Sequence, residues 1–364
     1  MNAHNFPPAP RTAIVGCGSW GTALATLLCP VSSKITLIGR NENVIEDINK
    51  NHRNERYLPG EVLDPGIKAS SDLGVTRDAD LILLVLPSAA IRSTATQLAS
   101  LQIGQKVILT SCSKGIERGT GKRMSEVISE ILPCQPLAAL SGPNHAEEVC
   151  KGLATMTVIG SAESSLSSYL QGLLTSPNFR CYTSDDLTGL EWGGAMKNIF
   201  AIASGIATGL GLGDNATAGL VTRGLAEMIR LGTALGGKPD TFTGLSGVGD
   251  LIATCYSHHS RNFRAGISIG KGNTVEATLE EREEVLLEGR VQELERRPRG
   301  DAENCGEQRE AEEGDDEAWH HLRGGWVRRP RRDWSGRRPR RVRPRRRLRS
   351  RRRPLRRPWR LWRS

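Results

Sequence analysis

The hydrophobic residues of the first 160 positions fall into short continuous runs that alternate with polar and glycine-rich segments. The runs occupy residues 12–15, 34–38, 80–86, 106–110, 137–140 and 155–159. A run that is apolar at successive positions is typical of a parallel strand whose two faces are both buried. The pattern therefore predicts an α/β domain built on a doubly wound parallel sheet.

The pattern changes near residue 185, where mostly apolar helical stretches with interspersed glycines begin. Residues 187–208 and 216–235 are predicted helices, and Asp214 and Asn215 are suited to cap the second one. Because these helices are apolar, we expect them to pack inside an all-α second domain.

The net charge of +10 belongs to the C-terminal tail. Residues 1–280 carry 23 Lys and Arg against 24 Asp and Glu, whereas residues 281–364 carry 27 Arg, no Lys and 16 Asp and Glu. The body is nearly neutral, which argues against nucleic acid or an anionic membrane as its partner. The tail is interrupted by prolines and lacks apolar periodicity, so we expect it to be disordered.

The eight cysteines contain no Cys-x-x-Cys pair and no His/Cys spacing typical of a metal site. They are expected to be small core or surface residues in a reducing compartment, and no bound metal is predicted. His258 and His259 are expected to face solvent.

The N-terminus has no signal pattern and no apolar run approaches about 18 residues, so we expect a cytoplasmic protein without a membrane span.

A glycine-rich turn follows the first apolar run directly. Gly16, Gly18 and Gly21 form a Gly-x-Gly-x-x-Gly motif between the strand at 12–15 and a predicted helix at 22–28, and the next strand is 34–38. In this context the first glycine allows the tight turn, the second allows close approach of a pyrophosphate, and the third allows the helix to lie near the sheet. The motif predicts a Rossmann-type dinucleotide-binding domain.

The end of the second strand suggests which dinucleotide is bound. An Asp or Glu there would bind the ribose 2′-hydroxyl of NAD, but this chain has Arg40. Arginine can pair with a 2′-phosphate through two hydrogen bonds, so NADP(H) is favoured over NAD(H).

Several polar or conformationally special residues follow the ends of later strands. Pro87, Lys114 and the turn from Gly142 to Asn144 each come directly after an apolar run. In an open α/β sheet the ligand lies beyond the carboxyl ends of the strands. We therefore expect these residues to share one crevice with the glycine loop.

Lys197 is the strongest candidate for acid/base chemistry. It lies among glycine, alanine and apolar residues, where loss of hydration would lower its pKa toward the range useful for proton transfer. Asp250 and Thr254 are four residues apart and so share a helical face. Arg261 and Asn262 combine a charged fork with an amide, a pair suited to a phosphate monoester.

Seven motifs in order carry a resemblance to a known family. They are the glycine loop, Ser-Lys-Gly at 113–115, Ser-Gly-Pro at 141–143, Gly-Gly-Ala-Met-Lys-Asn at 193–198, Gly-Leu-Gly-Asp-Asn at 211–215, Gly-Val-Gly-Asp-Leu at 247–251 and Ser-Arg-Asn at 260–262. Over about residues 11–280 the chain resembles bacterial NAD(P)-dependent glycerol-3-phosphate dehydrogenase. The resemblance implies interconversion of dihydroxyacetone phosphate and sn-glycerol 3-phosphate, which supplies glycerophospholipid synthesis, and it implies a homodimer.

The resemblance also implies roles for individual residues. Lys197 matches the catalytic lysine that exchanges a proton with the substrate oxygen at C2, and Asn198, Asp250 and Thr254 match its supporting network. The implied substrate-binding residues are Lys114, Gly142, Asn144, Ser260, Arg261 and Asn262, with Asn144 replacing a serine common in the family. The implied cofactor-binding residues are Gly16, Gly18, Ser19, Trp20, Gly21, Arg40, Pro87, Lys114, Ala146 and Arg261.

These observations divide the chain into an N-terminal extension (1–10), a dinucleotide-binding domain (11–184), a helical substrate domain (185–290) and an Arg-rich tail (291–364). The family would continue past residue 290 with amphipathic helices, so the helical domain is expected to be incomplete. One hypothesis is that a reading-frame change near 281–295 produced the tail, and the other is a genuine arm that binds nucleic acid. Two functional alternatives also stay open: a catalytically dead homologue, and a related β-hydroxyacid dehydrogenase.

Overall fold

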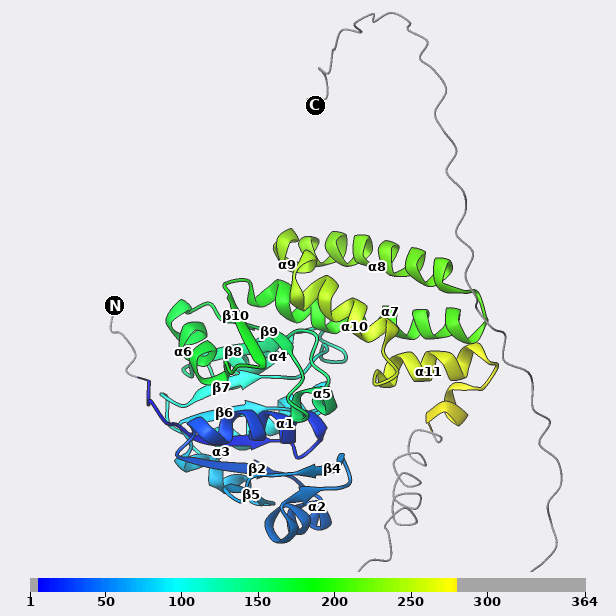
Figure 1. Cartoon of the computed structure of the whole chain (residues 1–364). Coiled ribbons are helices and arrows are strands. Elements are labelled where there is room, and N and C mark those ends of the chain that lie inside the picture. The colour runs from blue at the N-terminus through cyan, green and yellow to red at the C-terminus, as the bar shows by residue number, and fades with distance from the viewer. Residues whose placement is uncertain (1–5, 280–364) are drawn as a thin grey trace, which may run out of the picture. The chain divides into compact units, whose positions relative to one another are not determined.

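The apolar runs of the N-terminal half form one eight-stranded sheet in the computed structural model, which describes residues 6–279 (Figure 1). The strands of this sheet are β1 (Arg11–Val15), β2 (Lys34–Ile38), β5 (Ile67–Ser70), β6 (Leu81–Leu84), β7 (Ile108–Ser111), β8 (Leu137–Ser141), β9 (Thr155–Gly160) and β10 (Phe179–Ser184). Their order across the sheet is β10-β9-β8-β7-β6-β1-β2-β5, so the order reverses beside β1. A dinucleotide binds at such a switch point, beyond the carboxyl ends of the strands.

All six predicted strands are present, and one predicted direction is wrong. β9 was expected to continue the parallel sheet, but it pairs antiparallel with β8, and β10 runs parallel to β9. The chain leaving β8 at Ser141 returns within 13 residues and starts β9 at the same edge of the sheet. A parallel pair would have required the connection to cross back over the whole length of the sheet.

The parallel strands are buried because helices cover both faces of the sheet. All four residues of Leu81–Leu84 are buried. Alternate side chains of β1 enter different hydrophobic clusters, with Ile14 on one face and Ala13 and Val15 on the other. The covering helices and the small additional elements are α1 (Ser19–Leu28), α2 (Glu42–Glu46), α3 (Ser88–Ser100), α4 (Met124–Ile131), α5 (Ala146–Cys150), α6 (Ser164–Leu174), β3 (Arg53–Asn54) and β4 (Leu58–Val62).

A helical region follows the last strand. It contains α7 (Leu187–Gly209), α8 (Asp214–Ala234), α9 (Pro239–Thr243), α10 (Asp250–Tyr256) and α11 (Arg261–Gly270). Helix α8 begins two residues before its predicted start, so Gly213 is the N-cap, and Asn215 and Asp214, which were expected to cap the helix, lie in the first turn, with Asp214 as its first residue. There the Asp214 carboxylate still interacts favourably with the helix dipole.

Helices α7 and α11 approach closely through glycines on both. A Cβ on Gly205 would lie 2.1 Å from the carbonyl oxygen of Phe263, and one on Gly266 would lie 2.2 Å from that of Ile202. Only glycine permits backbones to come this near. The contact brings the N-terminus of α11 beside the middle of α7, where Lys197 lies.

Several expectations concern residues outside the described range. These are the end of the helical domain at 280–290, the disorder of the tail at 291–364 and its nucleic-acid binding. Within residues 6–279, no helix combines the length and apolar character needed to cross a membrane.

Candidate active site

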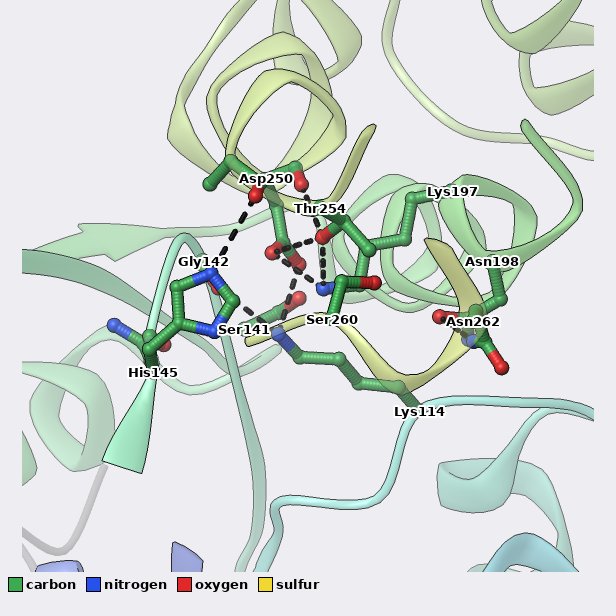
Figure 2. A network of polar contacts seen from close by, with 12 residues as sticks. Lys114, Ser141, Gly142, His145, Lys197, Asn198, Asp250, Thr254, Ser260 and Asn262 are labelled. Atoms are coloured by element: carbon green, nitrogen blue, oxygen red, sulfur yellow. Dashed lines mark hydrogen bonds and ion pairs between the residues drawn. The ribbon is translucent and has the colours of Figure 1, made fainter. Parts of the chain in front are cut away.

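Lys197 is buried in the middle of α7 and bound to two residues of α10. Its side chain is only 10% exposed. Nζ donates hydrogen bonds to Asp250 Oδ1 at 2.5 Å and to Thr254 Oγ1 at 2.9 Å (Figure 2). The predicted helical face that joins Asp250 to Thr254 is therefore the face that meets Lys197.

Asp250 connects Lys197 to a second lysine on another part of the chain. Its other oxygen, Oδ2, accepts a hydrogen bond from Lys114 Nζ at 2.8 Å. Lys114 follows β7 and also donates to the carbonyl oxygen of Gly142 after β8, at 2.9 Å. Gly142 has φ +149°, and a Cβ there would lie 3.1 Å from Thr157 Cα, so glycine is required to present this carbonyl group.

The hydroxyl group of Thr254 has a defined orientation. It donates its hydrogen to the carbonyl oxygen of Asp250 at 2.6 Å, one turn back in α10. Its oxygen lone pair is therefore directed to Lys197. An ammonium group has three N–H donors. Asp250 and Thr254 accept two of them, so the third can serve a substrate oxygen.

The charges of this network act on each other. Burial lowers the pKa of Lys197 to about 8, with a further decrease from Lys114 and a partly opposing increase from Asp250. Burial alone would raise the pKa of Asp250, but the two lysines outweigh it and keep that pKa below its usual value. Asp250 is therefore ionised, and Lys197 can both hold and release a proton near neutral pH.

The N-terminus of α11 lies next to this network. Asn262 Nδ2 donates to Asn198 Oδ1 at 2.9 Å, so it contacts the residue that follows Lys197. Arg261 begins the helix, is exposed and makes no ion pair with any residue in 6–279. Ser260 is the N-cap of α11, and its hydroxyl oxygen accepts from the backbone N–H of Phe263 at 3.2 Å. The predicted phosphate-binding residues thus surround one helix end and adjoin the catalytic candidates.

Each glycine of the dinucleotide motif has a separate structural reason. Gly16 has φ +127°, and its Cβ would lie 2.1 Å from the carbonyl oxygen of Val85. Gly21 faces the carbonyl oxygen of Gly16, which a Cβ would approach to 1.9 Å. A Cβ on Gly18 would meet no protein atom within 4 Å. Gly18 therefore lies at an open surface, as expected if a pyrophosphate approaches there.

The N-terminus of α1 is suited to bind the phosphates of a dinucleotide. Gly18 is its N-cap, no side chain caps the helix, and no acidic residue lies in its first turn. Free backbone N–H groups and the positive end of the helix dipole then face the ligand. Ser19 and Trp20 lie in this first turn. The residues present therefore fit a bound NAD(P).

The remaining predicted cofactor residues lie on neighbouring elements. Arg40 follows β2, is exposed, and makes no ion pair within the described part of the chain. Pro87 follows β6 and is the N-cap of α3. Ala146 begins α5, which packs on α1. All three elements lie at or beside the switch point.

Asn144 uses its side chain to bind β9. Nδ2 donates to the carbonyl oxygen of Met156 at 3.1 Å, and Oδ1 accepts from the Thr157 hydroxyl at 3.1 Å. One amide hydrogen is left for another acceptor. The role of Asn144 as a substrate contact stays a prediction.

Sequence reasoning assigned no role to Glu191 or Ser141. Glu191 on α7 accepts from Arg123 Nη1 at 2.7 Å and from the backbone N–H of Ser125 at 2.8 Å, and so joins α7 to the N-terminus of α4. Ser141 ends β8 beneath α7, and its buried hydroxyl oxygen has no hydrogen-bond partner among the residues that the structure describes. An acidic residue within an apolar helix was the available signal for Glu191, and the Ser-Gly-Pro motif at 141–143 was the available signal for Ser141.

Metal-ligating side chains do not cluster in the described residues. No group of three His, Cys, Asp or Glu side chains in 6–279 has a geometry that could hold an ion. His258 and His259 are exposed.

Comparison with known protein families shows which family this chain resembles over most of its length. The model described as NAD-dependent glycerol-3-phosphate dehydrogenase N-terminus matches residues 11–167, and the corresponding C-terminus model matches residues 186–294. The chain belongs to this family. Both functional alternatives, the dead homologue and the β-hydroxyacid dehydrogenase, receive no support from these matches.

Individual members of the glycerol-3-phosphate dehydrogenase family are similar over most of the chain. The glycerol-3-phosphate dehydrogenase (NAD(P)+) of Desulfitobacterium hafniense is 47% identical over 272 residues, which are 74% of this chain and 77% of the relative. The enzyme of Enterococcus faecalis is 47% identical over 276 residues, which are 74% of this chain and 80% of the relative. The crystal structure of glycerol-3-phosphate dehydrogenase from Coxiella burnetii has a TM-score of 0.73 at 37% identity and covers 79% of this chain and 89% of that one.

Proposed function

We propose that this protein catalyses the NAD(P)H-dependent reduction of dihydroxyacetone phosphate to sn-glycerol 3-phosphate, and the reverse oxidation. The observation that carries the proposal is the network of Lys197, Asp250 and Lys114, of which Lys197 and Asp250 are buried, in a chain whose sheet also carries a dinucleotide-binding loop. Family membership narrows the substrate to this pair of triose derivatives. The product would supply glycerophospholipid synthesis.

Lys197 is proposed to donate the proton in this reaction. The nicotinamide cofactor supplies the hydride that reaches C2 of the ketone. Lys197 gives its third N–H to the C2 oxygen, and Asp250 and Thr254 keep Nζ oriented by accepting its other two hydrogens. General acid catalysis of this kind contributes about 10²–10⁴-fold to a rate.

Binding of the substrate is proposed to involve both ends of the site. Lys114, together with Asn198 and the backbone at Gly142, would bind the hydroxyl and carbonyl end. Ser260, Arg261 and Asn262 would bind the phosphate, because they bring a guanidinium group, an amide and the N-terminus of α11 together. Arg261 is exposed and unpaired within 6–279, so its charge is available to a phosphate.

The same proposal extends to the organisation of the protein. We place the boundary between the dinucleotide-binding and substrate domains at 184/185, between the end of β10 at Ser184 and the start of α7 at Leu187. The protein is proposed to work in the cytoplasm as a homodimer.

A steady-state assay on the full chain tests the function. Purified protein should oxidise NADPH or NADH only when dihydroxyacetone phosphate is added, and glycerol 3-phosphate with NAD(P)+ should drive the reverse reaction. No turnover with either cofactor, despite measurable cofactor binding, would sink the proposal. Turnover of a non-phosphorylated 3-hydroxyacid instead would favour the β-hydroxyacid alternative.

A further inference from the structure

We infer that Asn54 and Thr22 orient the glycine loop by holding two successive carbonyl groups of that loop, so that its N–H groups face the cofactor pyrophosphate. Neither residue is part of the Gly-x-Gly-x-x-Gly motif itself. The inference rests on the proposed dinucleotide-dependent function and assigns positioning residues to it.

The hydrogen bonds form a short chain beneath the loop. Asn54 is the last residue of β3 and is 1% exposed. Its Nδ2 donates to the carbonyl oxygen of Cys17 at 3.0 Å and to Thr22 Oγ1 at 2.8 Å. Thr22 is fully buried, and its hydroxyl donates to the carbonyl oxygen of Gly18 at 3.0 Å, beside the backbone N–H of Thr22, which donates to the same oxygen at 3.0 Å. Both carbonyl groups therefore accept a side-chain hydrogen bond.

Fixing these oxygens also fixes two N–H directions. In a planar trans peptide the C=O and the following N–H point in opposite directions. No described peptide bond is cis. The Cys17 carbonyl group shares its plane with the Gly18 N–H, and the Gly18 carbonyl group shares its plane with the Ser19 N–H. With the oxygens held toward Asn54 and Thr22, the two N–H groups point away from the protein interior.

The opposite side of the loop is where a ligand is expected. A Cβ on Gly18 would meet no atom there within 4 Å, and α1 has no side-chain cap. The first N–H groups of a helix need acceptors from outside the helix. A loop whose peptide planes are already oriented binds a pyrophosphate without the entropy cost of ordering them.

Asn54 cannot be replaced by an isosteric acid in this role. The Cys17 atom that Asn54 contacts is the carbonyl oxygen, which requires a donor. The amide oxygen Oδ1 of Asn54 has no hydrogen-bond partner among residues 6–279, so the bonds that Asn54 makes to the loop region come from Nδ2. An aspartate would place negative charge against the Cys17 oxygen and near the bound phosphates.

The test compares ligands with and without a pyrophosphate. The full chain and the variants Asn54→Ala, Asn54→Asp and Thr22→Val are titrated with NADPH, ADP and adenosine 2′-phosphate, and the melting temperature of each is measured without ligand. Loss of these hydrogen bonds should weaken the binding of NADPH and ADP about tenfold for Asn54→Ala, and by a smaller factor for Thr22→Val, in which the backbone N–H of residue 22 still holds the Gly18 carbonyl group. Asn54→Asp should weaken them more. The dissociation constant of adenosine 2′-phosphate should change less than twofold.

Gln171→Ala is the matched control. Gln171 also donates from a carboxamide to a backbone carbonyl group, that of Cys181 at 2.8 Å, but at the β10 end of the sheet. It should lower the melting temperature while leaving all three affinities unchanged. Turnover at saturating cofactor and the KM for dihydroxyacetone phosphate should stay near wild type in the Asn54→Ala variant.

Three results would overturn the inference. One is equal weakening of ADP and adenosine 2′-phosphate, and another is a lowered melting temperature without any change in ADP affinity. The third is additive loss of ADP binding free energy in the Asn54→Ala/Thr22→Val double variant. Because the two residues belong to one hydrogen-bonded chain, the double substitution should lose less binding free energy than the sum of the two single losses. Thr22→Val keeps the side-chain shape and provides the test if Asn54→Asp does not fold. Wild-type protein that binds no NADPH would contradict the proposed function instead.

Discussion

The glycine loop and the lysine network lie at the same edge of one sheet, but the loop presents backbone groups and the network presents side chains. The loop occupies six consecutive residues and presents backbone N–H groups. The network presents side-chain charges brought together from positions as far as 136 residues apart, as in the bond between Lys114 and Asp250. The proposed role of the loop therefore depends on local backbone shape, whereas the proposed role of the network depends on how distant elements pack.

The two regions should also differ in their response to pH. The loop and the first turn of α1 hold no ionisable side chain apart from the buried Cys17, whose pKa burial raises to about 12. The network holds two lysines and one aspartate, and burial lowers the pKa of Lys197 to about 8. Cofactor binding at the loop should hardly vary between pH 6 and 9, whereas the chemical step should vary strongly. Substitutions in one region alone should therefore change either cofactor binding or the chemical step, and leave the other unchanged.

Substitution of Lys197 should have the largest effect. Lys197→Ala removes the proposed proton donor, so kcat for dihydroxyacetone phosphate reduction should fall by about 10²–10⁴-fold. The dissociation constant of NADPH should change little, because the loop does not involve this side chain. Initial rates and a fluorescence titration measure the two quantities.

The control for Lys197→Ala is Lys238→Ala. Lys238 is an exposed lysine that pairs with Asp185 at 2.7 Å, and pairs of this kind contribute little. Its loss should leave kcat unchanged. If Lys197→Ala kept wild-type turnover, the catalytic assignment would be wrong.

Neutralising Asp250 should lower the rate and also move its pH dependence. Under the proposed mechanism reduction requires protonated Lys197, so kcat/KM of the wild type should fall as pH rises through about 8. Asp250 raises the pKa of Lys197. Asp250→Asn should therefore shift this decline to lower pH, with a loss in kcat on the order of 100-fold from the misoriented ammonium group.

Asp185→Asn provides the comparison for this change. It removes an exposed carboxylate of the Lys238 pair and should leave the pH profile in place. An Asp250→Asn profile that declines at the same pH as the wild type would contradict the electrostatic coupling between Asp250 and Lys197.

The contrast between local and distant organisation also explains how far the sequence could predict the structure. Gly16, Gly18 and Gly21 between two apolar runs were sufficient to predict strand, loop and helix, and the structure confirms all three. The bridge from Lys114 through Asp250 to Lys197 could not be derived from spacing, because it depends on how α7 and α10 pack against the sheet. The antiparallel direction of β9 was missed because an apolar run carries no information about strand direction. Asn54 was missed because it contacts the loop from a two-residue strand without a sequence pattern.

Two glycine substitutions separate folding from binding within the loop. Gly18→Ala places a methyl group in open space, so the melting temperature should hold while the NADPH dissociation constant rises about ten- to 100-fold through displacement of the pyrophosphate. Gly16→Ala combines φ +127° with a contact to Val85, and its strain should cost about 1–3 kcal/mol or more of folding free energy. Thermal melts with and without NADPH distinguish them. Equal melting temperatures for the two variants would contradict the structural distinction.

Arg40 should produce the smallest effect and should act on cofactor choice alone. If it pairs with the 2′-phosphate, Arg40→Leu should weaken NADPH about tenfold and leave NADH unchanged, because only NADPH carries the charge that Arg40 would bind. Raising the salt concentration should shrink the difference, since Arg40 is exposed. Arg180→Leu is the control: this arginine stacks on Tyr182 in β10, remote from β2 in the order of the sheet. Parallel weakening of NADPH and NADH by Arg40→Leu would instead indicate that Arg40 contributes to the adenosine site as a whole, and that the preference for a 2′-phosphate lies elsewhere.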